Sequence, residues 1–237
     1  MPLSDLPPCE RLALLLDFDG TLVELAPTPE SVVIPPGLGA LLARLSARLS
    51  GALALVSGRP LADIDRFLPG VPAAIAGEHG GVFRLAPNAP VSRPDLPAVP
   101  EAWREAGLRL VAAHQGARYE PKARGFVIHY RAIPEAEEAL RAPLAAMVAE
   151  DPAHFLLMPS HMAWEIRPRG ADKGSAVRTL LRDPRFRGRV PLFIGDDVTD
   201  ADGMAAARAA GGQGFFVADR FGDPAGVRRW LGTLAGA

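Results

Sequence analysis

The sequence predicts an α/β fold with a mainly parallel sheet, into which a second module of a different kind is inserted. In the N-terminal and C-terminal thirds, short apolar runs alternate with helix-like stretches, which is typical of buried parallel strands and the helices that connect them. Polar clusters follow three of these runs directly, as expected at the carboxyl edge of such a sheet, where ligands bind. In the middle third the order helix, strand, strand occurs twice, which indicates antiparallel strand pairs with helices on one face.

The composition indicates a globular protein without a strong overall electrostatic field. The chain has 237 residues, 49% of them hydrophobic, and a formal net charge of -1. We therefore expect neither a nucleic-acid partner nor a membrane partner, because no excess of basic residues draws the chain to phosphates or anionic lipids. Cys9 is the single cysteine, the N-terminal residues lack a basic region, and no apolar run approaches the ~20 residues of a membrane helix. A cytoplasmic location is the expectation.

The first apolar run ends in two acids. Residues 12–16 read as a buried strand, and Asp17 and Asp19 follow it, spaced i and i+2. Extended backbone sends such residues to one side, so both carboxylates are expected to face one point and to share a proton or a cation. The alternative is that Asp17 caps a helix and Asp19 belongs to a simple turn.

A second polar cluster follows the apolar run 53–56. Ser57 and Gly58 stand where a helix is expected to begin, so a hydroxyl, a free amide and the helix dipole together could cradle a phosphate. A plain N-cap role for Ser57 is the alternative. A third run, 73–76, leads into a turn that contains His79, whose role the sequence leaves open.

Lysine is scarce in this chain. Of the 26 basic residues only Lys122 and Lys173 are lysines, which singles out positions where a compact ammonium suits better than a guanidinium, unless they survive by chance. Lys173 is expected in the first turn of a helix, where the helix dipole disfavours a cation. An anionic group nearby should compensate.

Four aspartates follow the apolar run 190–194 within eight residues. They could form an acidic helix N-terminus, which the helix dipole tolerates. Together with Asp17 and Asp19 at a neighbouring strand end, they favour a site for a hard cation instead. The four acids are Asp196, Asp197, Asp200 and Asp202.

The middle of the chain differs from its flanks. Residues 85–100 have little periodicity and resemble a linker. We expect one domain from residues 1–93 and 169–237 and an inserted domain from residues 94–168. Polar residues on its strands could simply form a solvated face. Its expected helices are 101–113 and 135–149, and its expected strand pairs are 118–121 with 125–131 and 154–158 with 162–167.

The motif order resembles the haloacid dehalogenase-like phosphohydrolases. The matching stretches are DFDGT at 17–21, SGR at 57–59, DKG at 172–174 and GDDVTD at 195–200. Further stretches resemble the trehalose-6-phosphate phosphatase family: GEHG at 77–80, EPK at 120–122, HYR at 129–131 and EIRP at 165–168. One departure is His161, where the family often has Lys. The resemblance implies a Rossmannoid core with a parallel sheet and an inserted α+β cap domain of the C2B type.

The resemblance also implies roles for the core residues. Asp17 would be the nucleophile and Asp19 the general acid and base. Mg²⁺ would be held by the carboxylates of Asp17 and Asp196 and by the main-chain carbonyl of Asp19. The remaining implied contacts are Ser57 and Lys173 with the phosphoryl oxygens, Gly20, Gly58 and Arg59 with the substrate, and Asp197 and Asp200 with the groups they orient.

In the cap, the resemblance implies that Glu120, Lys122 and Glu165 bind glucosyl hydroxyls and that Arg131 reaches the phosphate. The implied activity is hydrolysis of trehalose 6-phosphate, with a trehalose-phosphate synthase as pathway neighbour. Two alternatives remain open at this point. One is a phosphatase of another sugar phosphate, such as sucrose phosphate or a glycosyl-phosphoglycerate, and the other is a non-catalytic regulatory module.

Overall fold

A computed structural model of the chain describes residues 7–160 and 162–236, so His161 lies outside the described residues. The chain divides into two compact units, Met1–Arg93 with Asp172–Ala237, and Pro94–Ala171. The second boundary falls after Ala171 instead of after residue 168. Residues beyond the last strand stay with the inserted unit because Arg169 N–H donates to the His154 carbonyl at 2.8 Å. Below, the first unit is called the core unit and the second the cap unit.

The core unit is built on a seven-stranded sheet of order β11-β10-β1-β2-β3-β4-β5. Its first five strands in this order are parallel, as the apolar runs predict, because strands covered on both faces need apolar residues at every position. The α/β prediction is confirmed. These strands are β1 (Leu12–Leu16), β2 (Leu53–Val56), β3 (Ala74–Gly77), β10 (Val190–Gly195) and β11 (Gln213–Phe216).

An antiparallel hairpin extends this sheet and was not predicted. Strands β4 (Val82–Arg84) and β5 (Val91–Ser92) add to β3 in turn. Part of the hairpin falls in residues 85–100, which the sequence assigned to a linker. Both residues of β5 are exposed, so the strand shows no alternation of apolar and polar residues from which it could be recognised.

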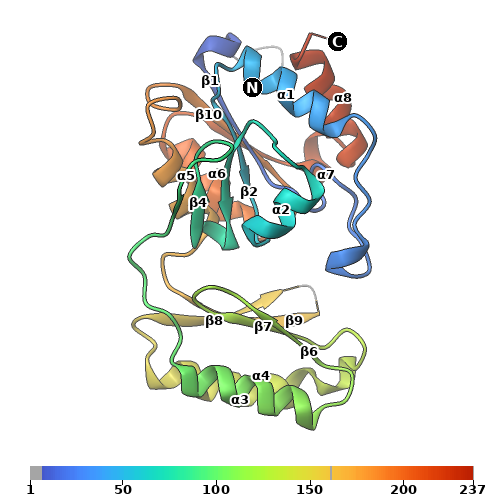
Figure 1. The fold of residues 1–237 in the computed structure, drawn as a ribbon, viewed down its shortest axis with the longest axis vertical. Coiled ribbons are helices and arrows are strands. Elements are labelled where there is room, and N and C mark those ends of the chain that lie inside the picture. The colour runs from blue at the N-terminus through green and yellow to red at the C-terminus, as the bar shows by residue number, and fades with distance from the viewer. Residues whose placement is uncertain (1–6, 161, 237) are drawn as a thin grey trace. The chain divides into compact units, whose positions relative to one another are not determined.

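Helices lie on both sides of the core sheet, with α5 beside α6 and α1 beside α8 (Figure 1). Strand β11 ends at Phe216, because a short helix begins at Val217. No helix in the described part of the chain is long and apolar enough to cross a bilayer. The helices are α1 (Leu38–Arg48), α2 (Leu61–Phe67), α5 (Lys173–Leu180), α6 (Asp200–Ala209), α7 (Val217–Arg220) and α8 (Pro224–Leu234), with 3-10 turns at Cys9–Arg11, Pro29–Ser31 and Glu78–Gly80.

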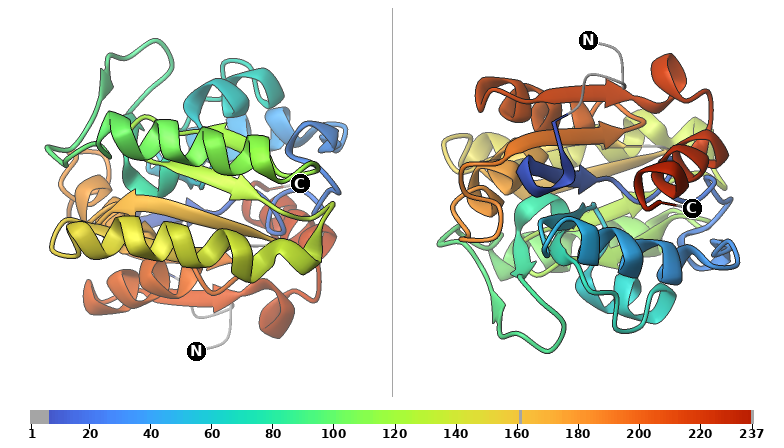
Figure 2. Two further views of the ribbon diagram at one scale, coloured as in Figure 1. Left: turned by 90° about the horizontal axis from the view of Figure 1, so that it is seen from below. Right: turned by 90° about the horizontal axis from the view of Figure 1, so that it is seen from above.

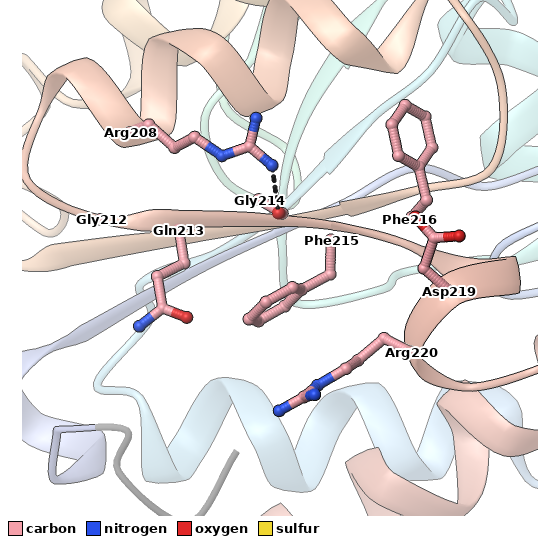
Figure 3. Close-up of a pocket in the computed structure, with 8 residues that line it drawn as sticks. All are labelled: Arg208, Gly212, Gln213, Gly214, Phe215, Phe216, Asp219 and Arg220. Carbon is pink, nitrogen blue, oxygen red and sulfur yellow. Dashed lines mark hydrogen bonds between the residues drawn. The ribbon is translucent and has the colours of Figure 1, made fainter. Parts of the chain in front are cut away.

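Strand β11 is an edge of the core sheet, and a pocket of about 610 Å³ lies beside it. Arg208 from α6 donates a hydrogen bond of 2.7 Å to the Gly214 carbonyl, and the Arg220 guanidinium lies 5.2 Å from the centre of the Phe215 ring (Figure 3). Charged side chains at a sheet edge discourage pairing with another strand. Arg208 and Arg220 are therefore explained by protection of this sheet edge, and the pocket needs no ligand to account for them.

The cap unit is a four-stranded antiparallel sheet of order β6-β7-β9-β8. Its two helices lie side by side on one face (Figure 2), and the apolar side chains between them and the sheet form a separate core. The predicted order helix, strand, strand, twice over, matches the observed one. The elements are α3 (Glu101–Ala113), β6 (Arg118–Pro121), β7 (Phe126–His129), the 3-10 turn Pro134–Ala136, α4 (Glu137–Glu150), β8 (Phe155–Ser160) and β9 (Ala163–Pro168).

The position of β1 at the centre of the core sheet leads to a stability prediction. Leu15 is fully buried between Phe193 of β10 and Ala54 of β2. We expect Leu15→Ala to lower the free energy of unfolding by about 2 to 5 kcal/mol, because it removes buried methyl groups and leaves a cavity. Urea titration measures this. The control Leu25→Ala changes a residue that is 68% exposed and should cost less than about 0.5 kcal/mol. Equal losses in both variants would contradict the central placement of β1.

Candidate active site

Three polar clusters meet at one edge of the core sheet. Asp17, Ser57 and Asp196 come directly after β1, β2 and β10, which are parallel and adjacent, with β1 in the middle. The carboxyl ends of parallel strands lie at the same edge, so the sheet itself brings these residues together. The Asp17 amide donates to the Ile194 carbonyl at 2.9 Å and continues the ladder between β1 and β10 by one residue.

Lys173 provides the central cation of this site. Its ammonium is buried and donates to Asp17 Oδ1 at 2.7 Å and to Asp200 Oδ1 at 2.6 Å. The residue begins α5, and the capping box of Asp172 with Ser175 fixes that start of the helix. We expected an anionic group beside Lys173, and two buried carboxylates are present there. Burial lowers the pKa of Lys173, but the charges of Asp17 and Asp200 outweigh burial and raise it.

One ammonium does not balance the acids around it. Carboxylate oxygens of Asp17, Asp196 and Asp200 all lie within 4.8 Å of one another. Burial and the charge of Asp200 raise the pKa of Asp17 well above its usual value and that of Asp196 to about 6. Burial also raises the pKa of Asp200, although Lys173 opposes this. Such a cluster binds either a proton or a cation.

The donor set fits a hard metal ion. Carboxylate oxygens are the ligands that hard divalent cations prefer. Asp200 has little capacity left, because its Oδ1 accepts from Lys173 and its Oδ2 accepts from the amides of Asp196 and Asp197 at 3.0 and 3.1 Å. Asp17 and Asp196 therefore supply the oxygens that remain for a metal, while Asp200 holds Lys173 and the β10–α6 turn in place.

Two glycines make this close approach of carboxylates feasible. A Cβ at Gly20, where φ is +71°, would lie 1.9 Å from Asp196 Oδ2, and a Cβ at Gly195 would lie 2.1 Å from Asp200 Cγ. Real Cβ atoms do not reach such distances. The glycines of the DFDGT and GDDVTD stretches thus leave the space into which these two acids fit.

The spacing of Asp17 and Asp19 predicts that their carboxylates meet at one cation, but the cluster in the described part of the chain contains the Asp17 carboxylate and not that of Asp19. Strand β1 stops at Leu16, and the chain then turns, with the Leu22 amide bonded to the Phe18 carbonyl at 2.9 Å. Residues i and i+2 share a side only while the backbone stays extended. The Asp19 carboxylate instead forms a two-point ion pair with Arg59, with Nε–Oδ2 at 2.6 Å and Nη2–Oδ1 at 2.8 Å. The Asp19 main-chain carbonyl remains a predicted metal ligand.

Ser57 is not a helix N-cap, because α2 begins at Leu61 with Pro60 before it. Its side chain is buried, and its Oγ accepts from the Arg59 amide at 3.1 Å. The backbone of His79 donates to the Ser57 carbonyl, and a Cβ at Gly58 would lie 2.6 Å from His79 Nε2. The His79 ring therefore packs directly over Gly58, and the structure gives this histidine a place beside the SGR stretch.

Charged residues also gather on the cap sheet. Glu120 accepts from Lys122 Nζ at 2.5 Å and is bonded to His129 Nε2 at 2.8 Å. Burial raises the pKa of Glu120, but its bonds to His129 and Lys122 outweigh burial and lower the value to about 2. Glu120 is therefore ionised at neutral pH, and its bonds to Lys122 and His129 hold it in one orientation.

The register of the cap sheet extends this cluster across three strands. Glu120 of β6 pairs with Val127 of β7, and Val127 pairs with Glu165 of β9, so the three side chains share one face. Their neighbours Phe126 and Ile166 pack into the cap core instead. This is the face that α3 and α4 do not cover. Glu165 also lies 3.9 Å from the Arg167 guanidinium, and Arg131 is exposed after β7.

Sequence reasoning missed two neighbours of these residues. Thr21 Oγ1 donates to Asp17 Oδ2 at 3.3 Å, and its place four residues after Asp17 is a signal only once the turn is known. His129 was noted without a role, and its bond to Glu120 depends on strand register.

The predicted residue Asp197 lies in the turn before α6. Asp197 accepts from the amide and hydroxyl of Thr199 at 2.7 Å, so its carboxylate stabilises the turn before α6.

The raised pKa of Asp196 leads to a prediction about metal-free protein. A carboxyl whose folded pKa is near 6 stabilises the fold fully below its unfolded pKa, near 4, and this contribution disappears as the pH rises to about 6. In the presence of chelator we expect Asp196→Asn to be more stable than wild type at pH 7.5 by about 1 kcal/mol, a value reduced for partial exposure.

At pH 4 this advantage should vanish, and urea unfolding at the two pH values measures the difference. Asp219→Asn is the control, because Asp219 is an exposed acid on α7 outside the cluster. A stability gain for Asp196→Asn that is equal at both pH values would contradict the repulsion inferred here.

The chain is similar in sequence to known proteins. A family model described as trehalose-phosphatase matches residues 15–217 of this chain. The trehalose-6-phosphate phosphatase of Escherichia coli (strain K12) is 35% identical over 216 residues, which cover 89% of this chain and 79% of that protein.

Two solved structures show a similar fold. The C-terminal domain of a C. albicans trehalose-6-phosphate phosphatase has a TM-score of 0.76 at 20% identity, with 96% of this chain and 92% of that chain covered. A haloacid dehalogenase-like hydrolase from Bacteroides thetaiotaomicron has a TM-score of 0.66 at 14% identity, with coverages of 94% and 99%. The match to the family model and the identity to the E. coli protein, added to the site at the sheet edge, show that this chain is a phosphatase of the trehalose-phosphatase family, with a haloacid dehalogenase-like fold.

Proposed function

We propose that this chain hydrolyses trehalose 6-phosphate to trehalose and inorganic phosphate. The observation that carries the proposal is the buried Lys173 ammonium between Asp17 and Asp200, beside Asp196, in a chain of the trehalose-phosphatase family. The site groups an anionic nucleophile with a fixed cation, as phosphoryl transfer requires. The E. coli relative, named as a trehalose-6-phosphate phosphatase, supports this choice of sugar.

Asp17 is the proposed nucleophile. A carboxylate oxygen of Asp17 attacks phosphorus in line, the bond from phosphorus to the sugar oxygen breaks, and an aspartyl-phosphate forms. Asp19 gives its proton to the leaving sugar oxygen and then takes one from the water that attacks the aspartyl-phosphate. The second displacement releases phosphate and restores Asp17. Lys173 keeps Asp17 oriented, because its ammonium is bonded to Oδ1.

We propose Mg²⁺ as the metal, held by the carboxylates of Asp17 and Asp196 and by the main-chain carbonyl of Asp19. The cation would neutralise negative charge on the phosphoryl group as it is transferred. The raised pKa values of Asp17 and Asp196 support a cation at this place, because burial and the charge of Asp200 disfavour their ionised forms more than Lys173 favours them. Mg²⁺ is preferred since it keeps few protein ligands and leaves room for phosphate oxygens.

The other residues of the core unit are proposed to position these groups. The Ser57 hydroxyl and the Lys173 ammonium bind phosphoryl oxygens, with Gly20 after β1 and Gly58 after β2 as further contacts to the substrate. Asp200 orients Lys173, which its bond of 2.6 Å supports, and Asp197 orients the turn between β10 and α6.

In the cap unit, the charged cluster on the sheet face opposite α3 and α4 is proposed to bind the sugar. Glu120, Lys122 and Glu165 offer the donors and acceptors that sugar hydroxyls need, and Arg131 would pair with the phosphate. The bonds of Glu120 to Lys122 and His129 support this role, because side chains held in one orientation bind hydroxyls at low entropic cost.

The two other readings of the sequence are not favoured. A phosphatase of sucrose phosphate or of a glycosyl-phosphoglycerate would not account for the match to the trehalose-phosphatase family. A non-catalytic regulatory module would not need a nucleophile, a cation and metal-binding acids together, and Asp17, Lys173 and Asp196 are all in place. We further propose a cytoplasmic location, with a trehalose-phosphate synthase as the pathway neighbour that supplies the substrate.

The nucleophile assignment is tested with Asp17→Asn. We expect turnover of trehalose 6-phosphate to fall below about one per cent of wild type, because loss of a covalent nucleophile costs several kcal/mol of barrier. Phosphate release measures this, and circular dichroism verifies the fold. Asp219→Asn on α7 should keep wild-type activity. An Asp17→Asn enzyme that still releases phosphate at a tenth of the wild-type rate would refute the assignment.

The cap assignment is tested with Glu120→Ala, Lys122→Ala and Glu165→Ala. Each should reduce kcat/KM for trehalose 6-phosphate by about tenfold or more, the effect of losing one charged hydrogen bond. Hydrolysis of an aryl phosphate, which has no sugar, should change far less. Glu138→Ala removes an exposed glutamate on α4 and serves as the control. Parallel loss of both activities in three folded variants would mean that these residues serve the chemistry and not sugar selection.

A further inference from the structure

Arg59 connects three segments of the core unit around the Asp19 carboxylate. Its Nε and Nη2 atoms donate to the two oxygens of Asp19 at 2.6 and 2.8 Å, which is the parallel two-point geometry of a strong guanidinium–carboxylate pair. Its Nη1 atom donates to the Pro29 carbonyl at 2.9 Å, in the loop that follows β1. Arg59 itself follows β2, directly after Ser57 and Gly58.

The guanidinium is held by its surroundings as well. It lies 5.9 Å from the centre of the Phe18 ring and 5.1 Å from that of Phe67, and its Nη1 is 3.8 Å from Asp63. Only 11% of the Arg59 side chain is exposed, against 30% for Asp19. Cation–π contacts and burial restrict the rotamers of a long side chain. The arginine is therefore the fixed member of the pair, and Asp19 is oriented by it.

We propose that Arg59 is a positioning residue that acts in turnover through Asp19, and that it does not bind the substrate directly. The proposal rests on the acid and base role of Asp19 in the proposed function. A carboxylate on a turn can rotate about two side-chain bonds, and the oxygen that gives or takes the proton must be directed at the reacting group. Arg59 fixes that orientation and links it to the loop at Pro29.

The hydrogen bonds favour this role over direct binding of the phosphate. Three of the five guanidinium N–H groups are directed at Asp19 and Pro29. Arg59 would have to release these partners before its two-point fork could hold a phosphoryl group. Lys173 already provides a buried ammonium beside Asp17.

The first experiment compares Arg59→Met, Arg59→Lys and Arg66→Met on trehalose 6-phosphate with Mg²⁺. Methionine keeps the unbranched apolar part of the side chain beside the aromatic rings but loses the charge and the donors. We expect Arg59→Met to lower kcat by about tenfold to a hundredfold and to change KM by less than about threefold, because the loss affects proton transfer and not binding. Arg59→Lys should recover part of kcat, since it keeps one charged donor.

Arg66 is a matched control on α2, the helix that begins two residues after Arg59. Its guanidinium lies 4.6 Å from the centre of the Phe67 ring and 3.4 Å from Asp63, so it makes an aromatic contact and an ion pair comparable to those of Arg59. Unlike Arg59, the Arg66 side chain is half exposed and is not among the donors to Asp19. Arg66→Met should change kcat by less than about twofold, as an exposed surface substitution. A loss in Arg66→Met as large as in Arg59→Met would overturn the proposal, because packing around Phe67 would then explain both.

The second experiment is a double-mutant cycle with Asp19→Asn, measured as single-turnover phosphate release at high enzyme concentration. If Arg59 acts through Asp19, adding Arg59→Met to Asp19→Asn should cost less than about threefold more, because the shared effect is already lost. A full additional loss, or a raised KM with unchanged kcat in Arg59→Met, would overturn the proposal and indicate a substrate contact. Wild-type turnover in Asp19→Asn alone would instead reject the acid and base assignment. If Arg59→Met does not fold, the same cycle is run with Arg59→Lys, and its additivity decides between the same outcomes.

Discussion

The buried ammonium of Lys173 is the interaction on which the organisation of the core unit depends. It joins the end of β1, through Asp17, to the start of α6, through Asp200, and it does so from the first turn of α5. An ion pair this deeply buried costs desolvation energy, and removing one partner leaves an uncompensated charge inside the protein. The desolvation energy of this ion pair is thus linked to catalysis, since the same hydrogen bonds orient Asp17, the proposed nucleophile.

Much of the core unit could be predicted because its signals are local. Apolar runs long enough to be strands end in glycines and acids, and the parallel sheet then aligns those ends without further information. The orientation of Asp19 could not be predicted in this way. It depends on where β1 stops and on Arg59, which lies forty residues further along the chain. Strand β5 was missed for a related reason, because its two exposed residues carry no pattern.

The cap unit shows where prediction from sequence ends. Its elements were recognisable because helices and strand pairs have distinct periods. The partners of its charged residues were not, because the pairing of Glu120 with Val127 and of Val127 with Glu165 depends on a register that turn lengths and packing decide. The bond between His129 and Glu120 follows from that register, and spacing alone does not reveal it.

The strand order has a consequence for how the chain is made. In the finished sheet Leu12 of β1 is paired with Val190 of β10, so the two strands that flank the acidic cluster emerge from the ribosome far apart in time. The intervening cap unit is a continuous stretch with its own apolar core and can fold while β1 still lacks one neighbour. Until β10 arrives, β1 presents an unpaired, wholly apolar edge that is open to wrong partners. The nascent chain should therefore depend most on chaperones during the interval between the completed cap and the synthesis of β10.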